Sequence, residues 1–227
     1  MQSDIKPKER PILLNAEMVR AVLDGRKTQT RRIIQSPAKN MQANGRKVID
    51  YREPGDKWYG EHVFSMRNQS GTWCDYTKEQ FLAKCPFGAV GDRLWVREKT
   101  RVDLLLSNRR AHVRYEADGA YQIVPIPERV KPMVEGSCMS NGCYREASRI
   151  TLEITGVRVE RLNSLSESDA LSEGCNGGHN SIPGYMYSAT PHEHFHHIWE
   201  TIYGAESWQA NPWVWVIEFK RVEGEHA

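Results

Sequence analysis

The chain has 227 residues, of which 39% are apolar and 26% charged, and its formal net charge at pH 7 is only +2. No stretch approaches the roughly 18 consecutive apolar residues of a membrane helix, and the N-terminal residues MQSDIKPKER lack the apolar segment of a secretory signal. Seven Trp and nine Tyr exceed what a disordered chain carries. These features predict a globular, cytoplasmic protein without a membrane partner.

The first predicted elements are a strand, a helix and a second strand. Ile12–Leu14 form a short apolar run, Asn15 is a good helix N-cap, and apolar residues then recur at helical spacing up to Gly25, which ends the helix. Residues 28–34 alternate as in a strand, with Thr28, Thr30 and Arg32 on one face. A basic loop is therefore expected between a helix end and a strand start.

Two stretches without a sustained period interrupt the pattern, at about 35–90 and 99–147, and we interpret both as loop-rich insertions. Trp58 and Trp73 in the first are candidates for stacking on bases. Between the insertions, Gly91–Glu98 reads as a turn and a strand, and His112–Ala117 within the second predicts another strand.

The C-terminal third carries the clearest signals. Ser148–Leu162 predicts a long strand with one buried face, followed by a short helix over Glu167–Glu173 that Ser164 would cap. A last helix is predicted from Thr190 to Gly204, with Pro191 at its first position, and Trp213–Val222 predicts a central strand. Several strands, few helices and no βαβ rhythm favour an α+β fold built on a small mixed β-barrel.

Charge is unevenly spread along the chain. Between Arg20 and Lys47 there are eight Lys or Arg residues and one Asp, whereas from Glu160 to Ala227 there are three Lys or Arg and ten Asp or Glu. This asymmetry has two interpretations. Either a basic surface faces a polyanion, or the two regions neutralise each other within the fold.

Cysteine and histidine patterns do not predict a metal site. The five cysteines are irregularly spaced, which is typical of reduced thiols. Cys138 and Cys143 come near to zinc-ligand spacing, and His192 and His196 lie one helical turn apart, but the sequence has neither a CxxC pair nor an HExxH motif. We expect neither a metal nor another cofactor.

Four blocks of sequence, in order along the chain, resemble the signature of ASCH domains. These blocks are GRKTQTRR (25–32), GDRLWVRE (91–98), LSESDALSEG (165–174) and WVIEF (215–219). The resemblance is to the longer ASCH proteins carried by bacteriophages and prophages. It implies a single domain over 1–227 with a PUA-like β-barrel and RNA binding. The two insertions are a departure from the compact ASCH amidohydrolases, which lack them.

Some bacterial ASCH proteins are amidohydrolases that remove acetyl from N4-acetylcytidine, and the resemblance extends to the three residues that they use. The matching positions are Lys27 as base, Thr30 as nucleophile and Glu173 as acid. A threonine hydroxyl needs a base to become nucleophilic. Neighbouring arginines would lower the pKa of Lys27, and Glu173 could protonate the leaving amine. The alternative is that the three residues have no catalytic role: Lys27 would be a cation at a helix end, Thr30 an ordinary strand residue and Glu173 a solvated acid.

Two functions of different classes therefore stand open. One is an amidohydrolase on an acylated cytidine-type substrate with Lys27, Thr30 and Glu173 as its triad. The other is a non-catalytic RNA-binding module; a ribonuclease is a weaker third hypothesis. Guanidinium groups are suited to binding phosphates under each hypothesis. Trp95 is expected either in a pocket wall or in the core. The expected substrate- or RNA-binding residues are Arg26, Arg31, Arg32, Trp95 and Arg97.

Overall fold

The computed structural model describes residues 6–34, 49–51, 62–67, 73–131, 133–139 and 142–222. Its helices are α1 (Ala16–Leu23), α3 (Lys78–Leu82), α4 (Glu167–Ser172), α5 (Pro191–Tyr203) and α6 (Ala205–Gln209). Its strands are β1 (Glu9–Leu13), β2 (Gln29–Ile33), β3 (Ile49–Tyr51), β4 (His62–Arg67), β5 (Trp73–Tyr76), β6 (Arg93–Arg97), β7 (Thr100–Leu106), β8 (Arg110–Tyr115), β9 (Tyr121–Pro125), β10 (Thr151–Arg161) and β11 (Trp213–Arg221). The α+β class predicted from the sequence is confirmed.

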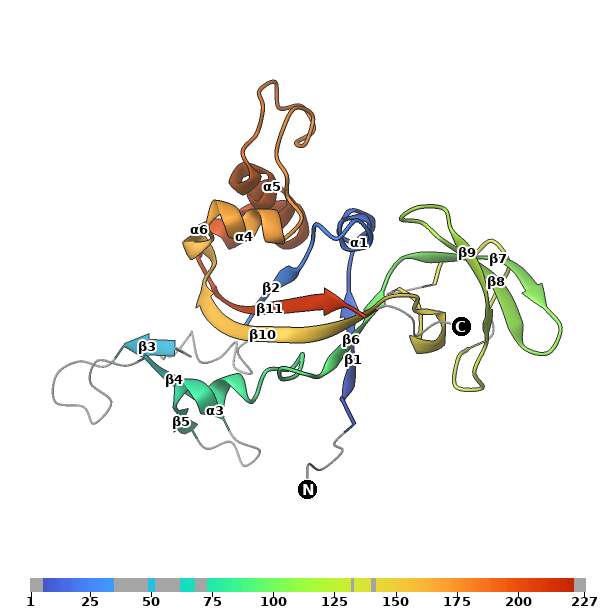
Figure 1. Ribbon diagram of the computed structural model, residues 1–227, viewed down its shortest axis with the longest axis horizontal. Helices are drawn as coiled ribbons and strands as arrows, with labels where there is room; N and C mark the ends of the chain where they lie inside the picture. The colour runs from blue at the N-terminus through green and yellow to red at the C-terminus, as the bar shows by residue number, and fades with distance from the viewer. Residues whose placement is uncertain are drawn as a thin grey trace.

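The centre of the molecule is a five-stranded sheet in the order β1-β6-β10-β11-β2 (Figure 1). Only β1 and β6 pair in parallel, and the other neighbours pair antiparallel. Each of its strands comes from one of the five segments predicted to share a sheet. Two three-stranded antiparallel sheets, β3-β4-β5 and β7-β8-β9, fall within the two predicted insertions.

The central sheet is open, so the prediction of a closed barrel needs correction. Strands β1 and β2 are its two edges, and no backbone pairing between them is found in the described residues. Helix α1 connects β1 to β2 and inserts Val19 and Val22 into the core. A side chain links the two edges instead, since Arg32 Nη2 donates to the Leu13 carbonyl over 2.9 Å.

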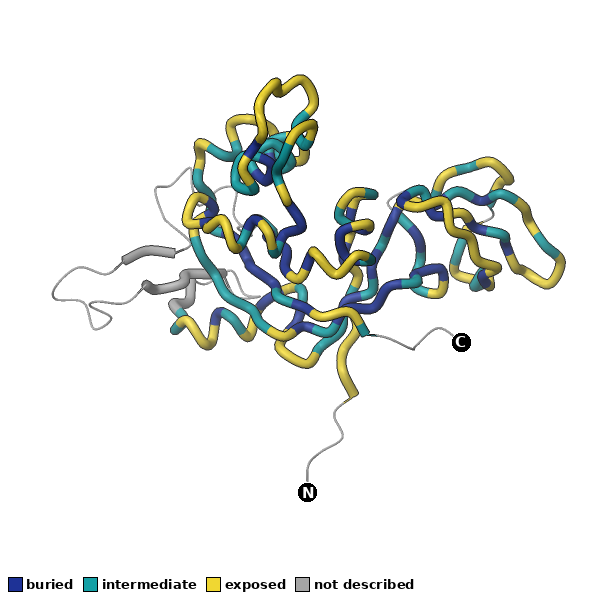
Figure 2. The backbone as a smooth tube through the Cα atoms, turned by 45° about the horizontal axis from the view of Figure 1, so that its top comes forward, coloured by how far each residue is buried: buried dark blue, intermediate teal, exposed yellow. Residues whose placement is uncertain are grey.

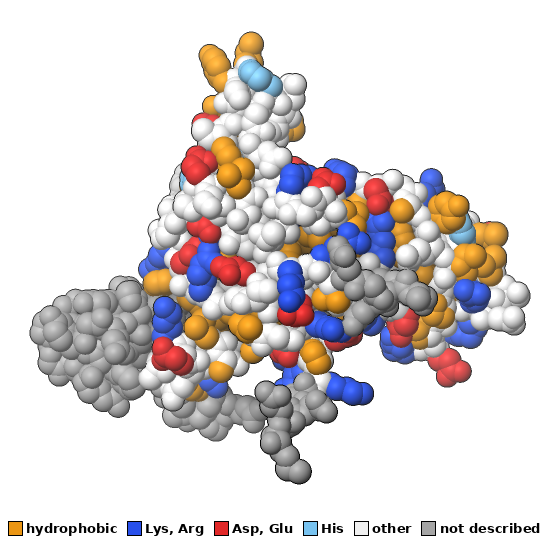
Figure 3. All heavy atoms as spheres, in the orientation of Figure 1, with side chains coloured by type: hydrophobic (Ala, Val, Ile, Leu, Met, Phe, Trp, Pro, Cys, Tyr) orange, Lys and Arg blue, Asp and Glu red, His pale blue; other side chains and the backbone are white. Residues whose placement is uncertain are grey.

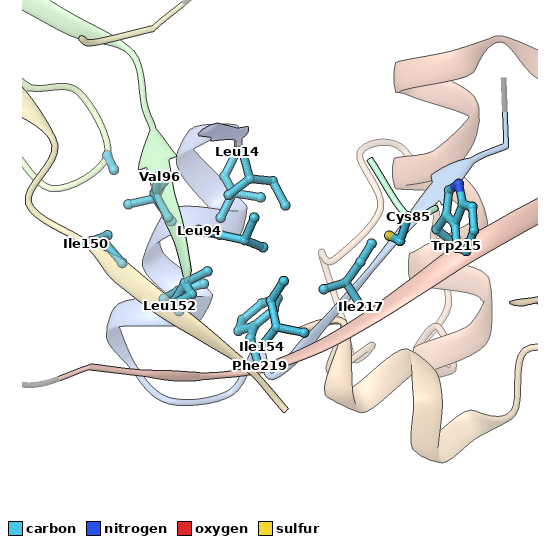
Figure 4. Packing of buried hydrophobic residues seen from close by; sticks show 14 of the residues in the cluster. Leu14, Cys85, Leu94, Val96, Ile150, Leu152, Ile154, Trp215, Ile217 and Phe219 are labelled. Carbon is cyan, nitrogen blue, oxygen red and sulfur yellow. The ribbon is translucent and has the colours of Figure 1, made fainter. Parts of the chain in front are cut away.

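Apolar layers lie on both faces of β11. One core packs Trp215, Ile217 and Phe219 of β11 against β6, β10 and α1 (Figure 4). In the same core Phe81 of α3 stacks on Trp215, with 4.9 Å between the ring centroids. On the other face, Val214 and Val216 contact Phe195 and Trp199 of α5. Because β11 alternates between two buried faces, its apolar residues run almost without interruption, as expected for a central strand.

Local signals place the helix ends as predicted, with one exception. Asn15 caps α1 by accepting from Met18 N over 2.8 Å, and Thr190 with Glu193 forms a capping box at α5. The cap of α4 is Ser166 with Asp169, not the predicted Ser164. Among the described residues, no helix has the length and apolar character needed to cross a membrane.

Candidate functional site

The basic loop predicted to carry the chemistry joins α1 to β2 and lies against the end of α4. Thr28 N donates to the Ser172 carbonyl over 2.8 Å, and Lys27 forms an isolated antiparallel bridge with Glu173. The backbone therefore fixes two segments 146 positions apart in the sequence beside each other. This contact brings together two of the three predicted catalytic residues.

Lys27 and Glu173 form a buried ion pair. Lys27 Nζ lies 2.6 Å from Glu173 Oε2 and also donates to the Glu173 carbonyl over 2.9 Å. The side chains are 0% and 3% exposed, respectively. A Lys and a Glu buried this deeply are normally paired, as these are. The pair is closed to solvent, and its ammonium faces a carboxylate rather than the crowd of arginines that the sequence suggested.

Arg31 extends this pair into a network of charges. Its side chain is 0% exposed, and Nη1 lies 3.2 Å from Glu173 Oε1 while Nη2 contacts Glu160 and, over 3.3 Å, Asp169. Arg158 joins from β10 and contacts Glu160 and Asp169 as well. The anions come from the acidic C-terminal third and two of the cations from the basic N-terminal segment. For Lys27 and Arg31, neutralisation within the fold is therefore the interpretation that holds.

The electrostatics of Asp169 show how far the network favours its ionised form. Burial alone would raise the pKa of this carboxyl, but hydrogen bonds from Ser166 and Gln29 and the charge of Arg31 outweigh burial. The pKa of Asp169 is consequently well below its usual value of 3.8. Asp169 also caps α4, so the network holds this helix on the sheet.

Thr30 lies on the opposite face of β2 from Arg31, which shares Glu173 with Lys27. It pairs with Ile217 of β11, a residue of the core that includes Trp215, whereas Arg31 pairs with Val216 on the α5 side. The Thr30 side chain is fully buried, and its Oγ1 accepts from Arg32 Nη1 over 2.7 Å. The structure thus brings base and acid together but not the predicted nucleophile, because successive strand residues point to opposite faces.

The concentration of charge at Arg26, Lys27, Arg31 and Arg32 predicts that these four side chains line one concave surface, but the structure does not place them on one. Arg26 turns outward, where it pairs with Asp24 over 2.9 Å and donates to the Gly174 carbonyl over 3.0 Å. Lys27 and Arg31 are buried in the network. Of the four, only Arg32 lines one of the two described cavities.

Trp95 and Arg97 line a different cavity, which we call the Trp95 cavity. It has a volume of about 570 Å³, and three further cationic residues contribute to its wall: Arg129, Lys131 and Arg145. Leu94 and Val96 point the other way and are 0% exposed, so Trp95 forms a pocket wall rather than core. Sequence reasoning missed the three added cations because residues 125–145 carry no periodic pattern.

Arg97 occupies an unusual position in this wall. Its Nε is buried and has no hydrogen-bond partner among the described residues. Gly142, at φ +80°, approaches so closely that an added Cβ would lie 3.0 Å from Arg97 Cβ. A glycine is therefore required for this contact. The buried Nε is costly and is not accessible to a ligand, so only the rest of the Arg97 side chain can contact a molecule in the cavity.

The Arg32 cavity, of about 540 Å³, adjoins the Trp95 cavity. The two share Cys138, Met139 and Gly142 in their walls. The Arg32 cavity is mostly apolar, with Leu13, Met18 and Ile202 among its lining residues, and has cations at Arg32 and Lys99. The two cavities are therefore neighbours, and we call them together the groove; residues of the central sheet, of α5 and of the second insertion line it.

The other candidates are placed as follows. No group of three His, Cys, Asp or Glu within the described ranges is arranged to hold a metal ion. Cys85, Cys143 and Cys175 are buried and Cys138 is exposed. His194 Nδ1 accepts from Gly177 N over 3.4 Å, and its Nε2 lies 3.2 Å from Glu17. Trp58 and the side chain of Trp73 lie outside what the structure describes.

Comparisons with family models, with curated proteins and with solved structures found no match. The functional argument is therefore carried by the groove and by the charge network around Lys27 and Glu173.

Proposed function

We propose that this chain is a non-catalytic RNA-binding module of the ASCH (PUA-like) type, which binds a single strand in the groove. The observation that carries the proposal is the Trp95 cavity. An indole and four cationic side chains, from Arg97, Arg129, Lys131 and Arg145, line one open volume. Aromatic faces that stack on bases and cations that neutralise phosphates are the two requirements for binding a single strand.

The chemistry of the groove favours a single strand over a duplex. An indole can stack only on a base that is not already stacked between neighbours. Two of the cations have acidic partners at the rim, Arg129 with Glu146 and Arg145 with Glu9. No ion pair of Arg97 or Lys131 is found among the described residues, so these two cations of the wall are the ones most suited to a phosphate oxygen.

The resemblance to ASCH domains supports the same proposal. Its four sequence blocks fall on β2, on β6, on α4 and on β11, and these elements pack around one sheet. The open sheet is a departure from the PUA-like barrel that the resemblance implies. The groove lies along the β1 and β6 side, bordered by the second insertion.

The first prediction tests the groove. Replacing Trp95 by Ala should weaken binding of a fluorescein-labelled oligouridylate about tenfold, since stacking contributes on the order of 1–3 kcal/mol per base. Replacing Arg97 by Gln should also lower the salt dependence of log K by about one phosphate contact. The measurement is fluorescence anisotropy over a salt series.

Lys220→Gln is the matched control for charge. Lys220 is an exposed cation on β11 paired with Glu153, and it lines neither cavity. Its loss removes one charge from the protein without touching the groove. If Lys220→Gln weakens binding as much as Arg97→Gln, or if the wild type does not bind the oligonucleotide, the groove is not the site.

The amidohydrolase is the second candidate, favoured by the convergence of Lys27 and Glu173. The position of Thr30 across the sheet argues against it. We expect no acetate release from N4-acetylcytidine or acetylated RNA above the rate without protein, and no shortening of the RNA. Release by the wild type, with loss of that activity in a folded Thr30→Val variant, would replace the module by the enzyme.

A further inference from the structure

The outer face of the β7-β8-β9 sheet carries apolar and aromatic side chains in register across three strands. Leu104 of β7 lies opposite His112 of β8, which lies opposite Ile123 of β9. One row along, Arg114 lies opposite Tyr121. The inner face packs Val102, Ala111, Val113 and Val124 into a separate core. Alternation in the strands therefore assigns the first set to the solvent side.

This outer face is more apolar than its position in the fold explains. Tyr121 is 66% exposed, Leu104 49% and Ile123 48%. An antiparallel sheet with one packed face normally presents polar residues on the other. Hydrophobic side chains gather on this end of the molecule with Lys and Arg beside them (Figure 3), and many of its residues are exposed (Figure 2). An exposed apolar patch of this kind marks a binding surface.

Two rings on this face are already arranged for stacking. The His112 and Tyr121 ring centroids are 4.7 Å apart, with planes inclined by 34°. His112 supports one side of the phenol ring, and the exposure of Tyr121 leaves it accessible. A flat sheet surface that presents aromatic rings is suited to unstacked bases.

Positive charge surrounds these rings. Arg101, Arg110 and Arg114 are on the same face by strand alternation, and two acids accompany them: Asp103, and Glu116, which lies 3.9 Å from Arg101 and also pairs with Lys99. Asp103 Oδ1 is 3.0 Å from Arg114 Nη2, and Asp103 Oδ2 is 3.9 Å from His112 Nδ1. The excess of cations complements a polyanion. It does not favour a second copy of this chain, because like charges would then meet across the interface.

We propose that the outer face of the β7-β8-β9 sheet is a second surface for single-stranded RNA, with Tyr121 and His112 stacking on bases and Arg110 and Arg114 binding phosphates. The proposal extends the proposed RNA-binding function to a site separate from the groove. The inner face of the same sheet lies toward the groove through Val102, so the two surfaces are on opposite sides of one insertion.

The test combines binding with cross-linking. Tyr121→Ala should weaken oligouridylate binding about tenfold, while Tyr121→Phe, which keeps the ring, should bind as the wild type does. Tyr187→Ala is the matched control, because Tyr187 is a 73% exposed tyrosine in the loop between α4 and α5. It should leave binding unchanged. Circular dichroism confirms that each variant is folded.

Cross-linking separates this surface from the groove. An oligonucleotide that contains 4-thiouridine is photo-cross-linked and the modified peptides are mapped. Cross-links to His112 or Tyr121 support the second surface, even where Trp95 shows none. Cross-links near Trp95 alone would support the groove as the binding site and overturn the second surface. The absence of cross-links at both sites would overturn both proposals. If Tyr121→Ala instead changes the sedimentation of the protein without changing RNA binding, the face is a contact between copies and the proposal fails.

Discussion

Replacing Glu173 by Gln should lower the free energy of unfolding by about 3–5 kcal/mol, the typical cost of breaking a buried ion pair on one side. The substitution keeps the shape of the side chain and removes its charge. Lys27 and Arg31, whose side chains are both 0% exposed, would then lose the negative charge that they share at Glu173. The measurement is urea denaturation, with the midpoint and slope compared between variants.

Glu167→Gln is the matched control for Glu173→Gln. It makes the same chemical change in the same helix, α4, but at an exposed residue in its first turn. We expect it to change stability by less than about 1 kcal/mol, as exposed charges do. Equal small losses for both variants would mean that Glu173 is not held in the network. The carboxylate would then be free to serve the amidohydrolase hypothesis.

These expectations assign a structural role to residues 25–32, the block that resembles the ASCH signature. Its most buried cations, Lys27 and Arg31, are neutralised by Glu160, Asp169 and Glu173 and anchor α4 to the sheet. The charge available to a polyanion comes from elsewhere. Between Arg93 and Arg149 the sequence has eleven Lys or Arg and seven Asp or Glu, and this stretch supplies the cations of both proposed RNA surfaces.

Much of the fold followed from local sequence signals. Asn15, Thr190 and Gly204 mark helix ends through backbone groups within a few residues, so no tertiary information is needed to place them. The alternation of Ile150, Leu152 and Ile154 predicted a half-buried strand for the same reason. The order of strands in the sheet and its open edges depend on long-range contacts, which these signals do not contain.

The candidate site was less predictable, and Thr30 shows why. The sequence correctly predicted that Thr30 and Arg32 lie on the same face of β2, because the alternation of side chains is a property of the strand itself. Which face α4 covers is decided by packing, and α4 covers the other one. Likewise, the cavity wall at Arg129, Lys131 and Arg145 comes from an irregular segment, where residue spacing carries no information about direction.

Gly174→Ala should cost about 2–4 kcal/mol of stability, from strain at a positive φ and from a steric clash. Gly174 has φ +90°, and an added Cβ would lie 2.7 Å from Ala21 Cβ and 3.2 Å from Lys27 Cβ. Gly174 directly follows Glu173 and approaches both Ala21 of α1 and Lys27, so the clash should also loosen the Lys27–Glu173 ion pair. Thermal and urea unfolding measure the loss.

Gly184→Ala separates the two causes. Gly184 has a comparable φ of +76° but no atom within 4 Å of an added Cβ, so it reports backbone strain alone. The difference between the two variants is then the contact with α1. Ala21→Gly in the Gly174→Ala background should recover part of that difference, because it removes the nearest atom. If Gly174→Ala costs no more than Gly184→Ala, the Gly174 backbone is not held tightly against Ala21, and the close approach next to the Lys27–Glu173 pair contributes nothing to stability.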